Sequence, residues 1–141
     1  LAIALTAALP GVPMVYYGEE IGMFGRGGGP PYWDNYRREP MDWYAAEDGP
    51  QHAAWFMPPD RWNRPNDGIS VEEQDADSGS LLNFYRRALK VRQNIPALRS
   101  GAMQVLSLEM DAPGAWGLAR SGDDQTVVAL FNFSDSPRQV T

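Results

Sequence analysis

The chain has 141 residues, a net charge of −6 at pH 7, 43% hydrophobic residues and no cysteine. This length suits one average domain and is too short for a closed (β/α)8 barrel of about 250 residues. The acidic balance argues against a nucleic-acid partner, the lack of cysteine excludes disulfides and thiolate metal sites, and no apolar run reaches the roughly 18 residues of a membrane span.

The first residues predict the end of a buried helix. Residues 1–9 are almost entirely apolar and rich in Ala and Leu, and Pro10 and Gly11 follow them as helix breakers. The chain opens on Leu1 inside this apolar run and stops just after a strand-like segment. We therefore expect a fragment of a larger protein.

A short apolar run at residues 12–17 predicts a strand buried on both faces. It stops at Gly18, and two carboxylates, Glu19 and Glu20, come next. A buried strand that delivers polar groups at its C-terminal end is typical of active sites in parallel α/β barrels. The order helix, turn, strand therefore predicts an α/β fold with a parallel sheet.

Residues 24–79 predict a long irregular segment. It begins with a cluster of Gly and Pro at 25–31 and contains widely spaced tryptophans. Loops of this length are uncommon in compact domains and are usually functional or disordered. The aromatic content favours an ordered functional loop, and tryptophans that merely pack on one another remain the alternative.

Residues 80–94 predict the clearest helix. One stripe at three- and four-residue spacing consists of Leu81, Leu82, Tyr85, Ala88, Leu89 and Arg92. Asp77 or Ser78 is the expected cap, and Pro96 ends the helix after Asn94. Residues 86, 87 and 90 are cationic and face away from the stripe, towards solvent.

The remainder of the chain predicts β-structure. Strands are expected at 102–108, 115–120 and 126–133, separated by turns at 111–114 and 121–124. The third strand looks like a central strand of a sandwich. Three strands cannot close a sandwich, so this domain is expected to be incomplete.

Four motifs follow one another in a fixed order. They are Pro-Met-Val-Tyr-Tyr-Gly-Glu-Glu-Ile-Gly-Met at 13–23, an acidic and basic stretch ending in Pro-Met-Asp-Trp at 34–43, Val-Glu-Glu-Gln-Asp at 71–75, and Pro-Ala-Leu-Arg-Ser-Gly at 96–101. With residues 129–134 they resemble the α-amylase family of glycoside hydrolases over essentially the whole chain. The Pro-Met-x-Trp form is closer to α-glucosidases, trehalose synthases and intermediate amylases than to plain starch amylases.

The resemblance implies two partial domains. Residues 1–100 would be the last part of a catalytic (β/α)8 TIM barrel, with a helix, strand eight, the substrate loop and the final helix, and residues 101–141 would begin an all-β sandwich domain. Retaining glycosidases need two carboxyl groups roughly 5 Å apart. In this family these groups, and a third carboxylate, come from strands four, five and seven, all upstream of Leu1. We therefore expect no catalytic residue here, a missing N-terminal barrel portion as partner, and an inactive isolated chain.

Asp34 and Arg38 are the candidate substrate-binding pair. A guanidinium offers a rigid fork of donors to sugar hydroxyls, and a carboxylate can accept hydroxyl bonds and hold the Arg. The resemblance implies contact with the glucosyl unit on the non-reducing side of an α-glucan or a small α-glucoside. A surface salt bridge worth about 0–1 kcal/mol is the alternative, and Arg37 could be the participant instead.

Three aromatic residues of the same loop are further candidates. Trp33 and Tyr36 could stack on sugar faces. Trp43 is expected to pack beneath the loop instead. If these rings bind sugar without a catalytic centre, the chain would be a carbohydrate-binding or accessory module, which is the rival interpretation.

Glu19 and Glu20 are unsuited to catalysis, because adjacent residues of an extended chain point to opposite faces. One is expected to cap backbone donors and the other to tie strand eight to its neighbours, close to the pocket with Tyr17. A supporting role at the floor of a sugar pocket is the alternative.

No metal site or cofactor is expected in this chain. His52, the sole histidine, is expected to be a loop residue. Asp75 and Asp77 have the spacing of weak calcium ligands, but helix capping explains them better. The resemblance allows calcium elsewhere in an intact enzyme.

Overall fold

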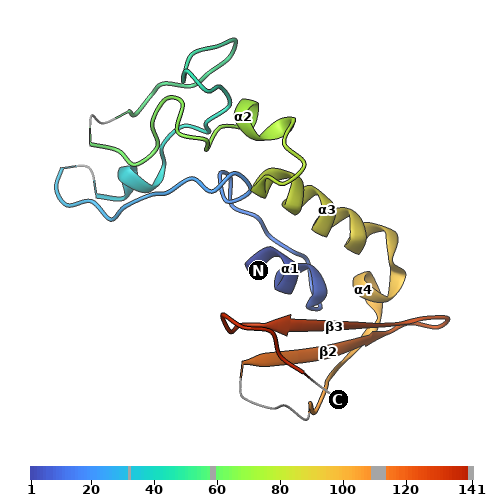
Figure 1. Cartoon of the computed structure of the whole chain (residues 1–141). Helices are drawn as coiled ribbons and strands as arrows, with labels where there is room; N and C mark the ends of the chain where they lie inside the picture. Colours follow the sequence, from blue (N-terminus) through green and yellow to red (C-terminus); the bar gives the residue numbers. More distant parts are fainter. Residues whose placement is uncertain (32, 58–59, 109–113, 140–141) are drawn as a thin grey trace. The chain divides into compact units, whose positions relative to one another are not determined.

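Figure 1 shows the computed structural model, which describes residues 1–31, 33–57, 60–108 and 114–139. The chain forms two compact units. One contains Leu1–Pro13 and Arg87–Thr141, and the other contains Met14–Arg86. The division into domains at 1–100 and 101–141 stays a prediction.

The first unit holds an antiparallel sheet of three strands, in the order β1-β2-β3. β1 spans Ala102–Val105. β2 spans Ala115–Ser121 and β3 spans Thr126–Asn132 (Figure 1). The three predicted strands are confirmed, although β1 ends early. Within the described residues β2 pairs on both sides and β3 on one, and the place of β3 in a complete sandwich stays a prediction. Residues 111–113 of the turn expected at 111–114 lie outside the described residues.

Helix α1 (Ala2–Ala8) provides the apolar partner of this sheet. Its Ala8 forms a buried cluster with Leu118 of β2 and Phe131 of β3. Successive side chains of a strand point to opposite faces of the sheet. Val128 and Leu130 therefore lie on the other face of β3 from Phe131, and they are exposed. The predicted N-terminal helix is confirmed.

Two buried arginines hold the C-terminal end of α1. Arg92 lies in α3 (Leu81–Asn94), and Arg120 lies in β2. Arg120 donates to the carbonyl of Ala8 at 2.8 Å and to that of Gly101 at 2.8 Å. The last carbonyls of a helix lack hydrogen-bond donors within the helix, and they form the negative end of its dipole. A guanidinium supplies both the donors and a positive charge. Burial, and then the nearby Arg92, lowers the pKa of Arg120.

A short helix, α4 (Pro96–Ser100), connects α3 to the sheet. α3 ends at Asn94 as predicted, and proline at the first position of α4 is compatible with a new helix start. The cap expected at Asp77 or Ser78 is wrong, because the hydroxyl of Ser80 accepts the hydrogen bond from the Asn83 backbone N–H at 3.2 Å.

The second unit consists mainly of the predicted irregular segment. It contains the 3-10 helix η1 (Trp33–Arg37), helix α2 (Val71–Asp75) and the start of α3. Ser70 and Glu73 form a capping box at α2, and these hydrogen bonds lower the pKa of Glu73 against the opposing effect of burial. An ordered loop with elements of its own is thus confirmed.

Residues 12–17 form no strand in this structure, and their place as a strand of a barrel stays a prediction. Val12 is 94% and Met14 88% exposed. A strand forms only when its backbone groups pair with a neighbouring strand, and no described residue pairs with this segment. The apolar pattern therefore has no sheet here in which to become buried.

Candidate functional site

A tight turn, which begins at Tyr16, follows the apolar run. Gly18 has φ +88°, and its carbonyl accepts the N–H groups of Gly22 and Met23 at 2.9 Å each. This left-handed conformation favours glycine, and a Cβ at Gly18 would lie 2.7 Å from the sulfur of Met23, so the Met23 side chain would have to move. This turn, rather than a strand end, places the neighbouring carboxylates.

The two glutamates have different surroundings. The Glu19 carboxylate accepts the N–H of Tyr16 at 3.3 Å, which confirms that one of them caps a backbone donor. Oε2 of Glu20 is buried and has no hydrogen-bond partner among the described residues. Burial raises the pKa of the Tyr85 hydroxyl, and both nearby glutamates raise it further.

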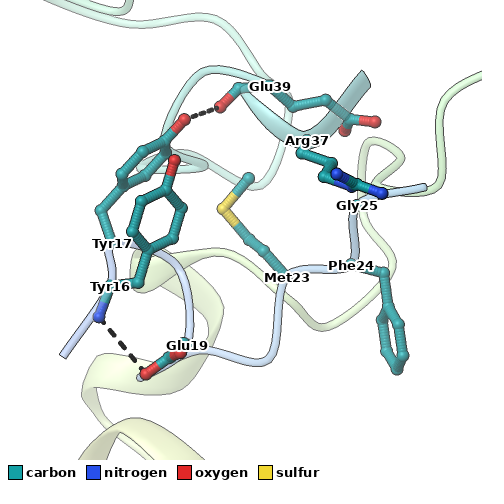
Figure 2. Close-up of a pocket in the computed structure, with 8 residues that line it drawn as sticks. All are labelled: Tyr16, Tyr17, Glu19, Met23, Phe24, Gly25, Arg37 and Glu39. Atoms are coloured by element: carbon teal, nitrogen blue, oxygen red, sulfur yellow. Dashed lines mark hydrogen bonds between the residues drawn. The ribbon is translucent and has the colours of Figure 1, made fainter. Parts of the chain in front are cut away.

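A pocket of about 230 Å³ opens beside this turn (Figure 2). Its lining consists of Tyr16, Tyr17, Glu19, Met23, Phe24, Gly25, Arg37 and Glu39. The two tyrosine rings lie next to each other on one side, with centroids 4.8 Å apart, and Arg37 and Glu39 lie on the other. Aromatic faces opposite a cation and a carboxylate suit a small ligand with both C–H and hydroxyl groups.

Tyr17 joins one side of this pocket to the other. Its hydroxyl donates to the backbone carbonyl of Glu39 at 3.0 Å. Burial, followed by the adjacent Tyr16, raises the pKa of this phenol, while Arg38 lowers it. The neutral phenol is the form that donates the hydrogen bond.

Asp34 and Arg38, the predicted pair, lie close together, but Asp34 forms its hydrogen bond with Arg37. Asp34 Oδ1 accepts a hydrogen bond from Arg37 Nη1 at 2.9 Å, whereas Arg38 Nη2 lies 3.9 Å from Asp34 Oδ2. The exposed helix η1 creates this geometry, because residues three apart on a helical turn are neighbours. Arg37 is also the one of the two that lines the pocket.

The predicted aromatic residues lie outside the lining of this pocket. Trp33 is exposed, and the guanidinium carbon of Arg26 lies 4.6 Å from the centroid of the Tyr36 ring. Trp43 is half exposed, and its expected packing beneath the loop stays a prediction. Its backbone is nonetheless held, since its carbonyl accepts the N–H of Glu72 at 3.0 Å.

Two buried residues that support the pocket were not predicted. The carboxylate of Glu39 accepts Asn63 Nδ2–H at 2.6 Å. Asn63 also forms a reciprocal pair of hydrogen bonds with the backbone N–H and carbonyl of Phe24, each at 3.0 Å. Glu39 stands in the conspicuous Pro-Met motif region, but no sequence pattern links it to Asn63.

The aspartates considered for calcium are engaged within the protein. Asp75 pairs with Arg86 at 2.7 Å, and Asp77 accepts the N–H of Gly79 at 2.8 Å. In the part of the chain that the structure describes, no group of three or more potential ligands surrounds a metal position. Both aspartates thus have partners within the protein.

Comparison with known proteins identifies the family. The family described as α-amylase, catalytic domain, matches residues 1–101. The chain belongs to this α-amylase family, as the motifs indicated.

Individual relatives agree with the family match. The chain is 31% identical over 134 residues to α-amylase 3 of Dictyoglomus thermophilum, covering 95% of this chain and 25% of the relative. It is 36% identical over 151 residues to the trehalose synthase/amylase TreS of Mycobacterium tuberculosis, covering 99% and 24%. The structure of an α-amylase from H. orenii matches with a TM-score of 0.71 at 32% identity, covering 94% of this chain and 24% of that one.

The chain thus spans about a quarter of the length of these relatives. Its small antiparallel sheet and its loop correspond to part of the α-amylase fold. Among the described residues, no helix is long and apolar enough to cross a membrane.

Proposed function

We propose that this chain supplies the glucoside-binding loop of an α-amylase-family enzyme that hydrolyses or transfers α-glucosyl units with retention. The observation that carries the proposal is the pocket in which two tyrosine rings lie opposite Arg37 and Glu39. Family membership supports an α-glucan or a small α-glucoside as the ligand. The catalytic carboxylates would come from the remaining barrel, and no cofactor is assigned to this chain.

The proposal includes the place of the chain in such an enzyme. Residues 1–100 would complete the (β/α)8 barrel, in which 12–17 would find strand partners, and residues 101–141 would begin the β-sandwich. The high exposure of Val12 and Met14 supports this, because apolar side chains of a barrel strand are buried once neighbouring strands are present. The partner required is therefore the rest of the catalytic domain.

We assign the sugar contact to the adjacent arginines, with Asp34 as the residue that orients them. The position of Arg37 on the pocket wall favours it, and the family motif favours Arg38. A charged hydrogen bond to a hydroxyl contributes about 1.5–3 kcal/mol. Because both arginines are exposed, the surface pair with Asp34 adds little to folding.

We expect alanine at the contacting arginine to lower kcat/KM on maltose or a nitrophenyl glucoside by about 10- to 100-fold, since a charged hydrogen bond is lost. Arg37→Ala and Arg38→Ala are compared in an enzyme that contains this chain, with melting temperature measured alongside. Arg99→Ala, an exposed arginine of α4, is the matched control. If both variants stay within twofold of wild type, the assignment is wrong.

Calorimetry distinguishes this proposal from the rival interpretation, in which the chain is a free-standing carbohydrate-binding module. The isolated chain is titrated with maltose up to millimolar concentrations. We expect no heat of binding, because the proposed pocket requires the rest of the catalytic domain. Saturable millimolar binding by the isolated chain supports the module and contradicts this requirement.

A further inference from the structure

A second, smaller cavity of about 10 Å³ lies within residues 39–63. Its charged and polar lining consists of Glu39, Asp42, Glu47, His52, Arg61 and Asn63. Glu39 lines both this cavity and the larger pocket. The cluster around the small cavity therefore supports one wall of the pocket, whatever ligand the pocket takes.

Part of this cluster is internally paired. Glu39 accepts a hydrogen bond from Asn63 at 2.6 Å, and Glu47 forms a largely buried ion pair with Arg61. These contacts leave Asp42 and His52 as the remaining polar side chains of the lining. Because burial of an unpaired polar group costs free energy, these two residues call for a partner.

The unpartnered atoms belong to two side chains of the same lining. Asp42 is only 4% exposed, and its Oδ1 is buried without a hydrogen-bond partner among the described residues. Both ring nitrogens of His52 are buried and likewise unpartnered in the described part of the chain. The T-shaped contact of the His52 ring with Tyr44, at 6.4 Å between centroids, fixes the ring from another side.

The cavity is large enough for one water molecule and no larger ligand. One water needs about 10–15 Å³ and two to four polar partners, and this cavity offers it the Asp42 carboxyl group and one nitrogen of the His52 ring. An ionised carboxylate only accepts hydrogen bonds, whereas a neutral imidazole donates from one nitrogen and accepts at the other. A water molecule both donates and accepts, so it can satisfy the two groups in either protonation state of the acid.

We propose that this cavity binds one water molecule, which bridges the Asp42 carboxyl group to the His52 ring and makes the loop a proton-binding site. Below the pKa of Asp42 the proton resides on its carboxyl group, where it turns an unpaired buried acceptor into a donor to the water. The ionised form leaves a negative charge in a lining that also holds Glu39 and Glu47, together with Arg61.

The surrounding charges give the direction of the pH dependence. Burial, followed by the negative charges of Glu47, Asp67 and Glu73, raises the pKa of Asp42 to about 6, against the lowering effect of Arg61. The raised value belongs to the folded state, so folding binds a proton at Asp42. Stability from this group is fully present below the ordinary pKa of about 4 and is lost as pH rises through about 6.

The test compares Asp42→Asn with wild type in thermal unfolding from pH 4 to pH 7. Asn keeps the shape and removes the titrating group, and Asp48→Asn, at an exposed position of the same segment, is the control. We expect the melting temperature of the wild type to fall by about 5 °C more than that of Asp42→Asn over this range. Parallel profiles for the two proteins overturn the proton-binding site.

A second measurement needs no variant. The carboxyl carbon of Asp42 is followed by NMR across the same pH range, and its midpoint is expected near the pKa of about 6. A midpoint at the value of Asp48 overturns the proposal. The water itself is tested by a high-resolution crystal structure of the chain, in which direct contact between Asp42 and His52 with no water between them contradicts the bridge.

Discussion

Arg92→Met is expected to lower the free energy of unfolding by about 3 kcal/mol or more. The Arg92 guanidinium is buried and donates to the carbonyls of Ala7 at 2.7 Å and Leu9 at 2.8 Å, and also to that of Gly11. Methionine can fill the space of the side-chain stem, but it leaves three carbonyl acceptors without this donor. Urea unfolding followed by far-UV circular dichroism measures the loss.

Two further variants sharpen this result. Arg99→Met changes an exposed arginine of α4 and is expected to stay within about 0.5 kcal/mol of wild type. Arg92→Lys keeps the charge, but a single ammonium group cannot reproduce the forked donor geometry, so it is expected to recover only part of the loss. A wild-type unfolding curve for Arg92→Met would refute the role given to this side chain.

Gln74→Leu is expected to destabilise the unit that carries the pocket by a similar amount, about 3 kcal/mol. The buried amide of Gln74 donates to the carbonyls of Ile21 at 2.7 Å and Gly68 at 3.0 Å, and it accepts the N–H of Leu82 at 3.0 Å. Leucine is close in size but offers none of these three bonds. Buried backbone groups left without partners cost about 1–3 kcal/mol each.

Tryptophan fluorescence during urea unfolding measures this effect, since most tryptophans of the chain lie in this unit. Gln93→Leu, at an exposed position of α3, is the matched control and is expected to be nearly neutral. Equal midpoints for Gln74→Leu and Gln93→Leu would show that Gln74 does not connect the glutamate turn to the start of α3.

Periodic and turn-bounded elements were predictable from sequence. The helix at 81–94 shows an apolar stripe, and the strands of the sheet are bounded by turn residues. Such patterns can be read from residues close together in the chain, because one face of each helix or strand is buried and the other is not. The segment at 12–17 had an equally clear apolar pattern, but a strand also requires a partner, which its own sequence does not supply.

The candidate site was predictable only in part. The resemblance singled out Tyr17, the two glutamates, and Asp34 with Arg38. Because Arg37 is adjacent to Arg38, the sequence also allowed Arg37 as the partner of Asp34. Helical geometry in η1 brings Arg37 within hydrogen-bond distance. Glu39 and Asn63 were missed because their contact joins residues 24 positions apart in an irregular loop, where no periodicity relates them.

The sequence by itself determined the family, the N-terminal helix, the helix at 81–94, the three strands and the loop that bears the candidate site, because motifs and hydrophobic spacing are properties of local chain segments. Only the tertiary structure decided which buried polar groups meet. The contacts of Arg92 with α1, of Gln74 with Ile21 and of Asn63 with Glu39 all cross long stretches of chain. A buried donor selects its acceptor by proximity in space, since desolvation penalises any group left unpaired.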